Sequence, residues 1–167
     1  MSGLSILGLA AAMVLAAYLF DICATPPNPS PPPQQDRPST DRIAILIWSR
    51  SHSAWVGHIA NAFILYHALV TALLVIAPEG VSQVCPNAAN RNKPLFQWSA
   101  PSTIGLSLIY LGLVTRILAY GGLGRSFTFH LAPPDHLITS GIYKWIQHAS
   151  YTGLFLILAG AHLLSGR

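Results

Sequence analysis

Charged residues are the scarcest feature of this sequence. Only 8% of the 167 residues are Asp, Glu, Lys or Arg, and 52% are hydrophobic, whereas an ordinary soluble domain carries about 25% charged residues. So few charges cannot solvate a globular surface, which excludes a soluble enzyme and a disordered tail. The basic residues form no stripe that could follow a phosphate backbone, which excludes a nucleic-acid binder. The composition therefore predicts a protein whose solvent is lipid.

Residues that could bind a metal are also few. Cys23 and Cys85 lie in unrelated contexts, so we expect neither a disulfide framework nor a metal site. His58 and His67 lie in an apolar run, but their nine-residue spacing places them on opposite faces of a helix. A haem-binding helical membrane protein would need a further ligand such as His162, and it is therefore the weakest of the alternatives.

Four apolar runs predict the fold class. They cover residues 4–24, 54–77, 103–120 and, with a polar beginning, 142–164. Backbone amides cannot cross hydrocarbon unpaired, so these runs should be helices. The sequence thus predicts an all-α fold, a polytopic transmembrane bundle of about four spans.

Proline divides the chain into three predicted parts. Seven of the thirteen prolines lie between Pro26 and Pro38, a composition typical of an extended polar linker. We predict an N-terminal transmembrane helix at 1–24, a linker at 25–53, and a membrane domain at 54–167. No basic residue precedes the first apolar run, which favours a retained anchor over a cleaved signal peptide.

The basic residues predict an orientation. The loops after the first and third runs hold five of them, Arg37, Arg42, Arg50, Arg125 and Lys144. The second loop and the C-terminus hold three, Arg91, Lys93 and Arg167. The excess of basic residues in cytoplasmic loops then places the first and third loops in the cytosol.

Polar residues with chemical potential gather after the third apolar run. We expect Thr139–Gly141 to cap a helix that begins near Ile142. On such a helix Tyr143, Gln147 and Tyr151 would share one face, beside Lys144 and His148. The free N–H groups of a helix start suit an anionic group, and aromatic rings suit a cationic centre. This arrangement favours a ligand that carries both a carboxylate and a positive centre.

Two stretches of this region resemble a family signature. Leu137–Tyr143 reads LITSGIY, and Gln147–Gly153 reads QHASYTG. They resemble the signature of the isoprenylcysteine carboxyl methyltransferases, in which Leu-Val-Thr-x-Gly-x-Tyr is followed, after three residues, by Arg-His-Pro-Ser-Tyr-x-Gly. The preceding LGRSFTF at Leu123–Phe129 is similar to the stretch that fungal members place there. Gln147 and Ala149 depart from the family's Arg and Pro, which removes a permanent cation and a rigid bend.

The resemblance implies a multi-pass enzyme of the endoplasmic reticulum membrane. Such an enzyme transfers the methyl group of S-adenosylmethionine to the C-terminal carboxylate of a prenylated cysteine. Its partners would be CaaX-type proteins and the lipid bilayer. Residue by residue, the resemblance places cofactor contacts at His136, Leu137, Ile138, Tyr143, His148, Ala149, Ser150 and Tyr151. Either Asp135 or His136 takes the place of the family's loop histidine, and no catalytic residue is assigned.

Relatives continue past the position of Arg167 into a further helix and a segment whose Arg and Glu bind substrate. We therefore expect part of the site to be missing from this chain. Two other functions stay open besides the haem protein: a phospholipid N-methyltransferase of the same broad group, and a non-catalytic truncated membrane protein. In the latter case His148 is an interfacial histidine, and Tyr143, Trp145 and Tyr151 form an aromatic belt.

Two further expectations concern the third apolar run. We expect the Arg116 side chain to extend to the lipid headgroups rather than to bind substrate. We expect glycines on or after this run to permit close helix packing, namely Gly105, Gly112 and Gly121–Gly122.

Overall fold

The computed structural model describes residues 2–25, 28, 50–87, 93–127 and 138–165. Every regular element in these ranges is helical, which confirms the all-α prediction. The long helices are α1 (Gly3–Ala24), α3 (Arg50–Ile76), α5 (Ala100–Leu123) and α6 (Ala149–Ser165). The short elements are η2 (Pro78–Gly80), α4 (Val81–Val84), η4 (Lys93–Leu95), η5 (Gly124–Ser126) and η6 (Gly141–Lys144).

Among the residues that the structure describes, three helices are long and apolar enough to cross a membrane: Gly3–Ala24, Gly57–Ile76 and Ala100–Leu123. The fourth, α6, has 17 residues, or about 26 Å at 1.5 Å per residue, which is less than a hydrocarbon core of about 30 Å. The chain is therefore a multi-pass membrane protein with three long spans and a shorter apolar helix. The fourth helix begins at Ala149 and not near Ile142 as predicted.

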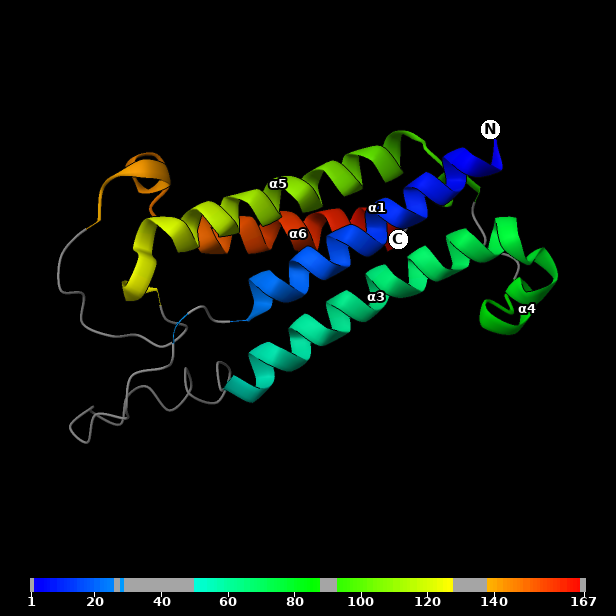
Figure 1. The fold of residues 1–167 in the computed structure, drawn as a ribbon, viewed down its shortest axis with the longest axis horizontal. Coiled ribbons are helices and arrows are strands. Elements are labelled where there is room, and N and C mark those ends of the chain that lie inside the picture. The colour runs from blue at the N-terminus through cyan, green and yellow to red at the C-terminus, as the bar shows by residue number, and fades with distance from the viewer. Residues whose placement is uncertain (1, 26–27, 29–49, 88–92, 128–137, 166–167) are drawn as a thin grey trace.

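The first helix packs inside the bundle. In Figure 1, α1 lies between α3 on one side and the α5–α6 pair on the other. Its Leu9, Met13 and Phe20 are buried against residues of the other long helices, among them Ile64 and Ile109. The N-terminal apolar run is thus part of the core, and its end lies beside the end of α5 and the start of α6 (Figure 1).

Helices α5 and α6 are antiparallel and touch through glycine. Gly105 faces Gly160, and Gly112 faces Gly153. A Cβ added to Gly112 would lie 2.5 Å from the Gly153 carbonyl oxygen, so the two backbones are in direct contact. We call these four residues the glycine seam. Close packing at Gly105 and Gly112 is therefore confirmed, as expected for membrane helices that pack without a hydrophobic driving force.

The other predicted glycines behave differently. A Cβ on Gly121 would meet nothing within 4 Å, so the prediction of close packing was wrong there. A Cβ on Gly122 would lie 3.1 Å from the ring of Tyr143, so at this glycine α5 packs closely on the 3₁₀-helix η6 and not on α6.

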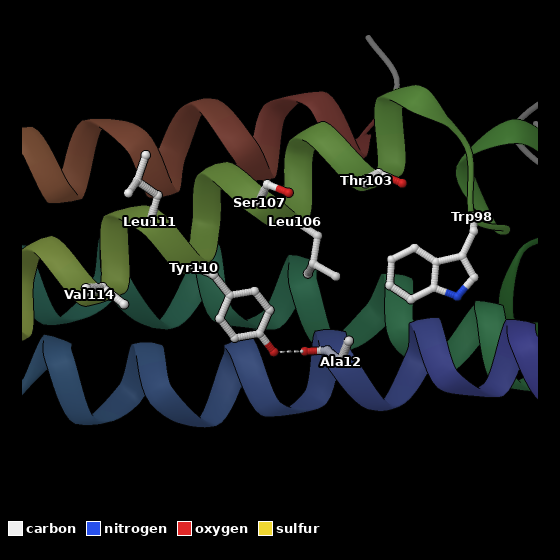
Figure 2. Close-up of a pocket in the computed structure, with 8 residues that line it drawn as sticks. All are labelled: Ala12, Trp98, Thr103, Leu106, Ser107, Tyr110, Leu111 and Val114. Atoms are coloured by element: carbon white, nitrogen blue, oxygen red, sulfur yellow. Dashed lines mark hydrogen bonds between the residues drawn. The ribbon is translucent and has the colours of Figure 1, made fainter.

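The opposite end of the bundle is tied by neutral side chains. Trp98 Nε1 donates to the Ser5 carbonyl at 2.9 Å. An open, mostly apolar groove of about 540 Å³ lies between α1 and the first part of α5. Figure 2 shows its wall, in which the Tyr110 hydroxyl donates to the Ala12 carbonyl at 2.8 Å. This groove lies toward the Trp98 end of α5, away from the signature residues.

Candidate functional site

The signature residues do not form one helix. Gly141 adopts φ +59°, a left-handed conformation, and residues 141–144 form the 3₁₀-helix η6. The backbone then closes tight turns from Tyr143 to Ser140 and from Trp145 to Ile142 before α6 begins. Tyr143 therefore lies outside the helix that holds Tyr151, and the predicted shared face with Gln147 was wrong. We call residues 138–148 the connecting segment.

Tyr143 anchors the connecting segment to α5. Its ring covers Gly122 so closely that a Cβ there would lie 3.1 Å from ring atom Cε2. Its hydroxyl donates to the Ala119 carbonyl at 3.4 Å. The side chain is half-buried, and this burial raises the pKa of Tyr143 above its ordinary value, so the phenol is neutral at physiological pH.

His148 and Tyr151 come together at the start of α6. Their ring centroids are 6.2 Å apart with an interplanar angle of 70°, an edge-to-face arrangement. Both side chains are exposed, whereas Ala149 between them is fully buried and fixes the helix start on the core. Two of the three predicted aromatic residues, His148 and Tyr151, thus lie side by side. The third, Tyr143, lies apart from them and packs against α5.

The remaining predicted contacts divide into two groups. His136 and Leu137, with the alternative Asp135, lie outside the described residues. Ile138 is half-buried at the beginning of the connecting segment. Ser150 is also half-buried, and its carbonyl and hydroxyl oxygens accept hydrogen bonds from Arg116 at 3.2 and 3.3 Å.

Arg116 is a residue of this site whose position the sequence did not predict. Its side chain is 6% exposed and turns into the bundle, where Nη2 donates to the Cys23 carbonyl at 2.9 Å and to the Tyr120 hydroxyl. The expected extension to the headgroups was wrong, because the side chain finds acceptors on α1, α5 and α6 inside the bundle. The sequence did offer one signal for this position, because an ionisable residue within an apolar run usually faces the interior of a helix bundle.

Asn28 adds a second tie between the end of α1 and the end of α5. Its Nδ2 donates to the carbonyls of Gly124 and Phe127, both at 2.8 Å. The Phe127 ring packs on Tyr120 at a centroid distance of 4.2 Å. No sequence signal could have identified Asn28, since it lies in the proline-rich stretch and bonds to residues about 100 positions away.

One histidine of α3, His67, packs against the segment that holds Leu95 and Phe96. His67 Nε2 lies 3.0 Å from the Leu95 carbonyl oxygen, and its ring stacks on Phe96 with centroids 4.5 Å apart. His58 is exposed on the other side of the helix. Within the described ranges no group of three side chains suitable for a metal ion occurs.

Comparison with known proteins shows which family this region of the chain resembles. Residues 104–167, which include α5 from Ile104, the connecting segment and α6, match the isoprenylcysteine carboxyl methyltransferase family. The similarity to that family covers less than half of the chain. The match extends beyond the signature in both directions and includes the whole glycine seam.

Three curated relatives show the extent of the similarity. The protein-S-isoprenylcysteine O-methyltransferase of Schizosaccharomyces pombe is 36% identical over 75 residues, 42% of this chain and 32% of that protein. The Saccharomyces cerevisiae enzyme of the same name is 37% identical over 68 residues, 38% of this chain and 28% of that protein. A probable protein-S-isoprenylcysteine O-methyltransferase of Oryza sativa subsp. indica is 34% identical over 67 residues, 38% of this chain and 35% of that protein.

The chain thus matches about a third of the length of these isoprenylcysteine methyltransferases. No solved structure gives a significant match. The similarity is therefore confined to α5, the connecting segment and α6, and it does not include α1 or α3.

Proposed function

We propose that this chain is a membrane-embedded methyltransferase that uses S-adenosylmethionine to methylate the C-terminal carboxylate of prenylated cysteine. The family match to residues 104–167 carries this proposal. It is supported by the structure, in which the exposed His148 and Tyr151 lie at one end of the bundle. The proposed protein substrates are of the CaaX type, and the proposed location is the endoplasmic reticulum membrane.

The described residues suit such a cofactor in two ways. A helix start such as that of α6 presents N–H groups whose acceptors lie outside the helix, and such groups suit a carboxylate. The His148 and Tyr151 rings stand edge to face beside them and are exposed, and an aromatic face attracts a cationic centre. We propose that Ile138, with His136 and Leu137, covers the adenosine. When bound, S-adenosylmethionine supplies an electrophilic methyl group on a sulfonium centre.

The reaction makes modest demands on the protein. A terminal carboxylate with a pKa of about 3.5 is ionised at neutral pH and needs no strong general base. The chain must align the reacting groups and exclude water, which contributes up to about 7–11 kcal/mol in ideal cases. A prenyl chain gains roughly 0.8 kcal/mol per buried CH₂ in lipid. A site at the end of a helix bundle lets the prenyl chain stay in the bilayer while the cofactor arrives from water.

Binding of radiolabelled S-adenosylmethionine to the full chain in lipid nanodiscs tests the cofactor site. We compare the parent protein with His148→Ala and, as a matched control, with His162→Ala, an exposed histidine near the other end of α6. We expect His148→Ala to weaken binding at least tenfold and His162→Ala to bind like the parent. A parent that binds no better than His148→Ala would overturn the proposal.

A second assay tests the substrate. The same nanodiscs are given N-acetyl-S-farnesylcysteine in one series and phosphatidylethanolamine in another, with methyl ester and methylamine formation measured separately. We expect ester formation on the prenylcysteine alone. Methylation of the lipid amine would favour the phospholipid methyltransferase, and cofactor binding without either product would favour a non-catalytic membrane protein.

A further inference from the structure

Arg116 is a buried cation whose partners are all uncharged. Nη1 donates to the Ser150 carbonyl and hydroxyl, and Nη2 to the Cys23 carbonyl and the Tyr120 hydroxyl. Nε is buried and has no hydrogen-bond partner in the described part of the chain. Among the described residues, no carboxylate joins this group of contacts.

Burying a guanidinium among uncharged partners costs free energy of folding. Removing a guanidinium from water costs several kcal/mol, and neutral acceptors offset this less well than a carboxylate would. An apolar side chain of similar length, such as Met, could fill the same volume without that cost. Packing alone therefore does not explain a cation here, and its use must lie in the groups that it joins.

Arg116 joins the end of one helix to the start of another. Cys23 is the penultimate residue of α1, so its carbonyl is one of the last four that lack an N–H partner within the helix. A cation at this point also complements the negative end of the helix dipole. Ser150 is the second residue of α6 and lies between the exposed His148 and Tyr151.

The neighbouring residues make room for this link and reinforce it. A Cβ on Gly153 would lie 2.6 Å from Arg116 Cγ and 3.1 Å from its backbone nitrogen, so glycine is needed for the side chain to pass. The Tyr120 hydroxyl also donates to the Cys23 carbonyl. Asn28 fixes the chain just after α1 to the end of α5.

We propose that Arg116 is a positioning residue for the candidate cofactor site. It holds the first turn of α6 against the end of α1, which keeps the His148 and Tyr151 rings in their edge-to-face arrangement. As far as the cofactor is concerned, this inference rests on the proposed function. It also makes α1, which lies outside the family match, part of the support of the site.

Hydrogen–deuterium exchange of the full chain in nanodiscs, without cofactor, tests the positioning role directly. The variants are Arg116→Met, Arg116→Lys and Tyr120→Phe. Thr115→Val is the matched control, since Thr115 is buried on the same helix and its hydroxyl donates to the Leu111 carbonyl within α5. We expect Arg116→Met to raise exchange at 148–154 at least tenfold, while exchange in the first turn of α5 stays unchanged.

The other two variants should raise exchange at 148–154 by smaller amounts than Arg116→Met. Arg116→Lys should raise exchange at 148–154 less than Arg116→Met, because an ammonium keeps the charge but cannot reach both helices. Tyr120→Phe should produce a smaller rise at the same residues and keeps the test usable if Arg116→Met does not fold. Unchanged exchange at 148–154, or an equal rise in every helix, would overturn the positioning role.

Binding of radiolabelled S-adenosylmethionine separates this inference from the proposed function. We expect Arg116→Met to raise the Kd at least tenfold, Arg116→Lys to lie between it and the parent, and Thr115→Val to match the parent. If the parent binds no cofactor, the proposed function fails while the exchange measurement still decides the role of Arg116. If all variants bind like the parent, the positioning role fails and the proposed function stands.

Discussion

The glycine seam and the connecting segment belong to the same matched region and both lie against α5, yet they are built in opposite ways. In the seam, backbone meets backbone, and a single added carbon would clash with a carbonyl oxygen. In the connecting segment, Tyr143 makes the contact with α5, while Trp145 and Gln147 are exposed. The difference teaches that a tightly packed helix pair carries a short irregular stretch with exposed side chains, the kind of segment in which binding residues are often found.

Enlarging a glycine of the seam should have the greatest consequence. In Gly153→Val, the Cβ would lie 2.7 Å from the Gly112 carbonyl oxygen and would also strike Arg116. Because a carbonyl cannot move aside, we expect a loss of about 3 kcal/mol in stability, measured by thermal unfolding in nanodiscs.

The control for this variant is Gly121→Ala on the same pair of helices. Its Cβ would meet nothing within 4 Å, and alanine favours a helix over glycine by about 1 kcal/mol. Its unfolding temperature should therefore stay the same or rise. If Gly153→Val unfolded like the parent, direct backbone contact between α5 and α6 would be refuted.

Removing the anchor of the connecting segment should have an intermediate effect. Tyr143→Ala opens a void over Gly122, and for a half-buried ring we expect a loss of about 2 kcal/mol. Tyr143→Phe loses only the long hydrogen bond to the Ala119 carbonyl and should cost about 0.5 kcal/mol. Equal unfolding temperatures for the two variants would show that the ring does not anchor this segment.

Truncating an exposed residue of the connecting segment should have the least effect. Trp145 is 80% exposed, so Trp145→Ala should change the free energy of unfolding by less than about 0.5 kcal/mol. The measurement is again thermal unfolding in nanodiscs, beside Tyr143→Ala. A fall as large as that of Tyr143→Ala would mean that the exposed part of the segment is structural as well.

The membrane helices were the part of the fold that the sequence predicted well. The runs expected at 4–24, 54–77 and 103–120 correspond to α1, α3 and α5, which extend a few residues further at some ends. The helix expected from Ile142 failed because Gly141 and the tight turns after it delay α6 to Ala149. The structure packs Tyr143 of this stretch on Gly122 of α5, a contact that the local sequence does not reveal.

The candidate site was predicted in its residues but not in its arrangement. The signature located His148, Ser150 and Tyr151, and residues 104–167 match the family that it suggested. It could not show that Tyr143 faces Gly122, or that Ser150 accepts hydrogen bonds from Arg116. The acceptors that turn Arg116 inward include the Cys23 carbonyl, 93 positions away in the chain.

What the sequence determined by itself was the solvent of the protein and the places where the chain crosses it. Hydropathy adds up along a continuous stretch and needs no partner from elsewhere, so long apolar helices follow from composition. Only the tertiary structure decided that the Arg116 side chain turns into the bundle and that the His148 and Tyr151 rings lie together. A buried donor must find an acceptor wherever the fold brings one near, and that acceptor belongs to a distant helix.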